Sequence, residues 1–96
     1  MPDKTIDVTE KRIMRKKRQA VLDRISPIII EKLKVGITDV TEDKNLDTDL
    51  LSDSLDAAAI IMEVEDEFQI GIPEETVSRI QTIGDMVTAI IELQSK

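Results

Sequence analysis

The sequence lacks cysteine, histidine, tryptophan and tyrosine, and Phe68 is its only aromatic residue. Without cysteine the chain has no disulfide scaffold, no thiol nucleophile and no thiolate ligand for a metal ion. Without histidine it lacks the usual general base and zinc ligand at neutral pH, and one ring provides no platform for stacking bases. Catalysis could use only carboxylates, lysines and hydroxyls. The composition therefore points away from an enzyme, and we predict neither catalytic residues nor a metal site.

Long hydrophobic runs are also missing. The longest uninterrupted apolar run covers the six residues 57–62, far short of a membrane span. Residues 1–7 contain no apolar stretch that could serve as a signal peptide. We therefore expect a cytoplasmic protein without membrane insertion, and we expect it to be a monomer. At 41% hydrophobic residues, the chain is too apolar to be wholly disordered.

The charges divide the chain into two unlike parts. The 13 Lys+Arg and 20 Asp+Glu give a formal net charge of −7. Residues 1–35 hold ten bases and five acids, a net +5, whereas residues 36–96 hold three bases and fifteen acids, a net −12. Such opposed parts indicate a basic arm on an acidic domain. We assign residues 1–19 to a basic N-terminal extension and residues 20–96 to the domain.

Apolar periodicity predicts four helices. The first opens near Thr9 and ends at Gly36, with a kink or a restart expected where Ser26 precedes Pro27. The second spans about 54–69, the third is a short one near 74–79, and the fourth begins at a Thr82 cap with Asp85 reaching back. We therefore expect an all-α fold: a small antiparallel four-helix bundle, with three main helices and a short third.

A long polar loop, residues 37–53, separates the first and second helices. Loops of this length in small domains are more often functional than idle. We expect the loop to be held to the core by four apolar side chains, those of Ile37, Val40, Leu46 and Leu50.

The second helix carries two apolar faces. At 100° per residue one face is formed by residues 57, 60, 61, 64 and 68, and it suffices to bury the helix. Leu55, Ala58, Ala59 and Met62 lie on the opposite face, among several acids. Scattered exposed apolar side chains are common and often mean little. The alternative is a recognition face on which charge steers partners and on which Leu55 and Met62 make apolar contacts.

Ser54 stands where the polar loop meets this helix. A helix N-terminus presents unpaired N–H groups and the positive end of the dipole, so it favours a phosphate, and Ser54 is suited to carry a phosphodiester. A serine at this place is also a common helix cap. Ser52, two residues earlier, offers a second hydroxyl that spacing does not exclude.

The segment 49–56, Asp-Leu-Leu-Ser-Asp-Ser-Leu-Asp, resembles the Asp-Ser-Leu motif of acyl carrier proteins. The likeness continues through Met62, through the acidic stretch ending at Phe68 and through Ile72-Pro73, and it covers roughly residues 20–93. Together these features are far more specific than an isolated Asp-Ser-Leu. The resemblance implies the four-helix bundle of that family, in its stand-alone form.

This resemblance implies that Ser54 carries 4′-phosphopantetheine, which a phosphopantetheinyl transferase takes from coenzyme A. Asp53, Leu55 and Asp56 would complete the motif that the transferase recognises. The arm's thiol would hold acyl groups as thioesters for acyl-transferring and acyl-processing enzymes of fatty-acid or related lipid synthesis. The partner-binding residues would be those of the acidic second helix: Leu55, Asp56, Ala59, Met62, Glu63, Glu65 and Asp66.

Two positions depart from the family pattern. Leu51 stands where members usually have glycine, and Ala59 stands where many have an acid that partners recognise. Both differences favour a specialised member over the housekeeping carrier. The alternatives are a carrier for polyketide, peptide or other activated-acid synthesis, or an unmodified helical adaptor. With the resemblance counted, we expect Ser54 both to carry the prosthetic group and to cap the helix.

The sequence contains two weaker patterns, an acidic stretch and a basic run. The acids in residues 43–54 suggest a calcium loop, but Thr48 and Ser54 occupy the places where an EF-hand needs glycine and glutamate. Residues 11–18 hold six bases in eight positions. This run fits a solvated arm, a dock for an acidic partner, a contact with the chain's own acidic helix, or a contact with anionic lipid. Nucleic acid is not expected, because the acidic domain behind the arm would repel phosphates.

Overall fold

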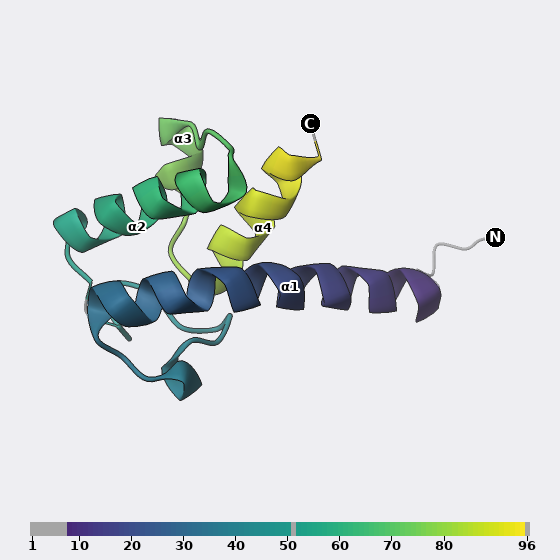
Figure 1. Ribbon diagram of the computed structural model, residues 1–96, viewed down its shortest axis with the longest axis horizontal. Helices are drawn as coiled ribbons and strands as arrows, with labels where there is room; N and C mark the ends of the chain where they lie inside the picture. The colour runs from purple at the N-terminus through teal and green to yellow at the C-terminus, as the bar shows by residue number, and fades with distance from the viewer. Residues whose placement is uncertain (1–7, 51, 96) are drawn as a thin grey trace.

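The computed structural model describes residues 8–50 and 52–95. Its elements are α1 (Val8–Leu33), the short 3₁₀ helix η1 (Ile37–Asp39), α2 (Ser54–Phe68), α3 (Glu74–Val77) and α4 (Ile83–Gln94). α2 runs back along α1, α4 rises at an angle from α1 beside the C-terminal end of α2, and α3 lies on the side of α2 away from α1 (Figure 1). The predicted all-α fold with four helices and a short third is confirmed.

α1 provides one wall of the core. Val21, Ile25, Ile28 and Ile29 are buried on a single face, and α1 packs against both α2 and α4. From α2 the core receives Ile60, Val64 and Phe68. From α4 it receives five residues: Ile83, Met86, Val87, Ala89 and Ile90. The interior is thus built almost wholly from branched aliphatic side chains.

The expected restart at Ser26 and Pro27 is wrong, because α1 continues through both residues. Ser26 does not cap a new helix: its buried hydroxyl donates a hydrogen bond to the Leu22 carbonyl at 2.7 Å. Pro27 lies on the exposed side, where water can replace the backbone donor that proline lacks. The buried stripe on the other side holds the helix together across this position.

The end of α1 also differs from the expectation. α1 stops at Leu33, and Lys34 takes the left-handed conformation, with φ of 58° and its N–H donating to the Ile30 carbonyl at 2.9 Å. Gly36 has an extended backbone, and its N–H donates to Asp39 Oδ2 at 3.0 Å. A lysine therefore occupies the position that glycine most often takes after a helix.

α1 runs through residue 19 without interruption. The division of the chain into an extension, residues 1–19, and a domain, residues 20–96, stays a prediction.

Three of the four expected apolar side chains hold the loop between α1 and α2 to the core. Val40, Leu46 and Leu50 are buried as expected, but Ile37 is exposed and does not anchor the loop. The loop backbone also pairs with the segment before α4: the Leu46 N–H donates to the Gln81 carbonyl, and the Ile83 N–H donates to the Lys44 carbonyl. The loop that leads into α2 is therefore fixed to α4.

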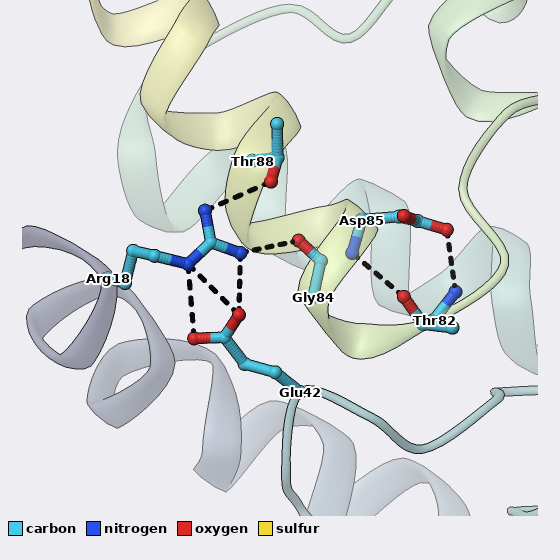
Figure 2. Close-up of polar contacts among 6 residues, drawn as sticks. All are labelled: Arg18, Glu42, Thr82, Gly84, Asp85 and Thr88. Atoms are coloured by element: carbon cyan, nitrogen blue, oxygen red, sulfur yellow. Dashed lines mark hydrogen bonds and ion pairs between the residues drawn. The ribbon is translucent and has the colours of Figure 1, made fainter. Parts of the chain in front are cut away.

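Arg18 ties three segments together (Figure 2). Its guanidinium donates to both carboxylate oxygens of Glu42, with the shortest contact 2.6 Å from Nη2 to Oε1. It also donates to the Gly84 carbonyl and to Thr88 Oγ1, each at 3.0 Å. Gly84 makes this approach possible, because a Cβ there would lie 3.0 Å from the Glu42 carbonyl oxygen. Arg18 thus fastens α1 and the long loop to the first turns of α4.

The predicted cap of α4 is confirmed. Thr82 Oγ1 accepts from the Asp85 N–H, and Asp85 Oδ2 accepts from the Thr82 N–H, both at 3.0 Å (Figure 2). Asp85 Oδ2 also accepts from the Gln81 N–H at 3.0 Å. The two backbone donors on its carboxylate hold the pKa of Asp85 below its ordinary value of 3.8. The ionised side chain therefore stabilises the helix start.

We predict that Arg18→Ala and Glu42→Ala each lower the free energy of unfolding by about 1–2 kcal/mol, because each removes a charge-assisted, two-pronged contact. Urea denaturation of both single variants and the double variant measures their coupling. The double variant should lose less than the sum of the singles. Arg15→Ala, on an exposed residue of the same helix, is the matched control and should change stability by less than about 0.5 kcal/mol. Additive losses would show that the two side chains do not act together.

We predict that Asp85 contributes to stability at neutral pH and that this contribution is lost as the pH falls through its lowered pKa. A carboxyl whose folded-state pKa is depressed favours the folded state above its unfolded pKa, so the loss lies below about pH 4. Thermal unfolding of the wild type and of Asp85→Asn between pH 7 and pH 2 checks this. The two melting temperatures should differ at neutral pH and approach each other in acid. A difference that is independent of pH would contradict the prediction.

Candidate functional site

The start of α2 is capped by Asp53. Asp53 has an extended backbone, its Oδ1 accepts from the Asp56 N–H at 2.8 Å, and Asp56 Oδ2 approaches the Asp53 N–H at 3.5 Å. Ser54 is the first helical residue and its side chain is exposed. The expectation that Ser54 itself caps the helix is wrong. Because the neighbouring aspartate satisfies the backbone donor, the serine hydroxyl faces solvent rather than the helix.

Ser52 is removed as a rival hydroxyl. Its side chain is buried and its Oγ donates to the Leu46 carbonyl at 2.8 Å, beside a bond of 3.0 Å from its own N–H to the same oxygen. Ser54 is accessible from solvent, whereas Ser52 belongs to the packing of the loop. The structure thus separates two serines that the sequence leaves equivalent.

An open hollow of about 450 Å³ lies beside Ser54. Its walls come from Asn45–Thr48 in the loop, from the start of α2 and from Ile80 and Gln81 before α4. Asn45 shapes the loop wall, because its Oδ1 accepts from the N–H groups of Asp47 and Thr48 at 2.8 and 2.9 Å. Sequence reasoning missed Ile80 and Gln81 as neighbours of Ser54, and no local pattern could have identified them.

The hollow continues toward a smaller apolar cavity of about 60 Å³ between α2 and α3. The two share Leu46, Ser52, Ala57 and Ile80 in their walls. The cavity holds about the volume of two water molecules. An exposed serine at a helix N-terminus, next to an open hollow with an apolar inner end, fits a phosphate-linked arm with an aliphatic cargo.

The outer face of α2 is apolar at two prominent places. Leu55 is 80% exposed and Met62 is 69% exposed, with Ala58 and Asp66 exposed beside them and Ala59 half-buried. This confirms the second apolar face expected from the periodicity. Methionine is flexible and suits a surface that contacts several partners.

Several acids of α2 have structural partners. Lys32 of α1 donates to Glu63 at 2.7 Å, and this hydrogen bond raises the pKa of Lys32 above its ordinary value. Glu65 Oε2 accepts from the Ile72 N–H at 2.7 Å and so holds the turn after α2. Of the acids assigned to the partner face, Asp66 remains exposed away from these contacts and Asp56 stands in the capping turn.

The two departures from the family pattern have unequal outcomes. Leu51 lies outside the described residues, and Ala59 lies half-buried on α2 next to the exposed face.

Within residues 8–50 and 52–95 no three His, Cys, Asp or Glu side chains gather as a metal site. No helix in that part of the chain is long and apolar enough to cross a membrane.

Comparison with known proteins agrees with this geometry. The sequence profile of the family described as "Phosphopantetheine attachment site" matches residues 23–90. The solved structure of an acyl carrier protein from Enterococcus faecalis is similar to this chain, with a TM-score of 0.68 and 32% sequence identity. The match covers 79% of this chain and 96% of that one.

We predict that Asp53→Ala lowers the free energy of unfolding by about 1 kcal/mol, because it leaves an α2 backbone donor without its cap. Ser54→Ala should change it by less than about 0.5 kcal/mol, since the exposed hydroxyl does not hold the helix. Thermal and urea denaturation of the two variants provide the comparison. An equal or larger loss for Ser54→Ala would return the capping role to Ser54.

Proposed function

Because this chain belongs to the acyl carrier protein family, we propose that its Ser54 bears the 4′-phosphopantetheine group and that the protein serves fatty-acid or related lipid synthesis. Members of this family are not themselves catalysts. They interact with modifying enzymes and present acyl groups to acyl-processing enzymes. The single observation that supports Ser54 is its exposure at the first position of α2, next to a buried Ser52.

The residues around Ser54 have separate roles in this proposal. Asp53 fixes the helix start and so the direction of the Ser54 side chain. Leu55 and Asp56, on the first turn, form the surface that the transferase contacts. When attached, the group supplies a thiol that holds an acyl chain as a thioester. The protein's own contribution is to present that position, which raises the local concentration of the cargo at a bound partner.

The apolar cavity behind the hollow supports an aliphatic cargo. Ile60, Ile61 and Ile80 line it, and none of them offers a hydrogen bond from its side chain. A polar peptide or polyketide unit would be desolvated there without compensation. At about 60 Å³ the cavity takes only the first methylenes of a chain, so a longer chain requires α2 and α3 to move apart.

The exposed face of α2 is the proposed contact for partner enzymes. Leu55 and Met62 supply apolar area, and Asp66 supplies charge that steers a basic partner. Glu63 and Glu65 contribute less than the sequence suggests, because each has a partner within the chain.

We predict that incubation with coenzyme A and a phosphopantetheinyl transferase adds the mass of one phosphopantetheinyl group to the intact protein. Ser54→Ala should abolish the gain. Ser52→Ala is the matched control and should retain it, with circular dichroism to check that the variant is folded. A wild type that gains no mass is an unmodified adaptor, and a gain that survives Ser54→Ala places the attachment elsewhere.

The nature of the cargo has its own measurement. Mass spectrometry of the carrier isolated from its own cells should find saturated or hydroxylated aliphatic acyl groups on the arm. Aminoacyl or polyketide groups would contradict lipid synthesis and leave the attachment at Ser54 intact.

A further inference from the structure

The apolar stripe of α1 continues beyond the bundle. Ile13 and Met14 lie seven residues, two helical turns, before Ala20 and Val21, so each pair shares a face of the helix. Val21 is buried, but Ile13 and Met14 are 49% and 44% exposed. The N-terminal half of α1 projects past the other helices (Figure 1). The side of α1 that enters the core therefore extends for about two turns with no described element covering it.

A notch is formed between α1, the last residue of α2 and the C-terminal part of α4. It is a hollow of about 340 Å³ whose apolar walls include Ala20, Val21, Phe68 and Ile91, with Lys17 and Arg24 at its edge. We call this hollow, together with Ile13 and Met14, the α1–α4 notch. Phe68 is the last residue of α2, so the hollow lies at the other end of α2 from Ser54.

The charges beside the notch are basic and crowded. Lys11, Arg12, Arg15, Lys16 and Lys17 are all exposed, and within the described residues none of them forms an ion pair. Lys11 and Arg15, like Arg12 and Lys16, stand four residues apart on the helix, where like charges repel. An anionic partner would relieve this repulsion.

Arg24 links the basic edge to the apolar wall. Its guanidinium lies 4.1 Å from the centre of the Phe68 ring and contacts Glu67 twice, through the side chain at 3.1 Å and the carbonyl at 2.8 Å. These contacts hold Arg24 in place at the side of the notch. Lys17 has no such contacts among the described residues, so it is the cation at the notch that remains available to a ligand.

We propose that the α1–α4 notch binds an acidic amphipathic helix of a partner protein. Two diverging helices with an apolar floor accept a third helix, which lays its own apolar face into the groove. The basic residues then face acids on the flanks of that helix. This surface is independent of Ser54, so a partner held in the notch leaves the start of α2 free.

A membrane surface fits these observations less well. Helices that lie on bilayers have one apolar face bordered by bases, whereas the bases of this segment surround the helix, with Arg15 about 160° from Lys17. Residues 36–96 also carry a net charge of −12, which repels anionic lipid as well as nucleic acid. A localised acidic helix avoids most of that repulsion.

The test uses the full chain and a synthetic 18-residue helical peptide with a leucine face and glutamate flanks. Fluorescence anisotropy should show binding that weakens with salt. Amide shifts in a ¹⁵N spectrum should change at residues 13–24 and 91–95. A peptide with the same leucines and lysine flanks should bind at least tenfold more weakly. Equal binding of the two peptides, or shifts centred on Leu55 and Met62, would overturn the proposal.

Two charge reversals separate the notch from general attraction. Lys17→Glu should weaken binding of the glutamate peptide at least tenfold. Arg15→Glu makes the same charge change on the far side of α1 and should weaken this binding less than threefold. Ile13→Glu provides a second variant on the notch side. Equal effects of Lys17→Glu and Arg15→Glu would refute a specific notch.

Two further measurements identify other occupants. Sedimentation of the unliganded chain should show a monomer; a dimer that the peptide dissociates would make a second copy the occupant. Binding to vesicles of anionic phosphatidylglycerol that Lys17→Glu abolishes would make the surface a lipid contact. Either result would overturn a partner helix, and neither bears on modification of Ser54.

Discussion

The burial of one aliphatic stripe on α1 is the constraint on which the rest of the structure depends. Both other long helices pack against α1, and Ile25 and Ile29 are fully buried between them. Phe68 is the only aromatic side chain of the core, so its stability comes mainly from contacts between branched aliphatic side chains. The long loop and α3 have few apolar residues of their own and take their positions from this packing.

Polar contacts at the edges of the core then fix the functional end. Arg18 and the backbone pairing of Leu46 and Ile83 attach the loop to α4, and the loop in turn delivers Asp53 to the first turn of α2. A shift of one residue in where α2 begins would exchange the environments of the neighbouring hydroxyl and carboxylate. Asp53 prevents this shift, because its carboxylate completes the backbone bonding and leaves Ser54 outward.

The features predictable from the sequence were those set by local patterns. The bounds of α2, the start of α4 with its Thr82 cap and the second apolar face follow from periodicity and from side chains within four residues of each other. The errors at Pro27, Gly36 and Ser54 all concern where a helix begins or ends. At Ser54 the adjacent Asp53 takes the capping role. At Pro27 the outcome depends on which side of the helix is buried, and this is a tertiary property.

Contacts between distant residues were beyond sequence reasoning for the same reason. Arg24 pairs with Glu67 and Lys32 with Glu63, so part of the positive charge of α1 is used to neutralise one flank of α2. The net charge of −7 therefore conceals an internal cancellation at the α1–α2 seam.

The apolar and charged side chains that the core leaves uncovered gather at two places, the start of α2 and the start of α1. At the start of α2 an apolar face with Leu55 and Met62 accompanies the exposed serine, and at the start of α1 a basic segment accompanies Ile13 and Met14. A carrier needs no catalytic group, so the lack of histidine and cysteine costs it nothing; it needs surfaces that its own core leaves uncovered. Because the charges at these two places are too far apart to cancel within one copy of this chain, we propose that each place selects its partner by charge of the opposite sign.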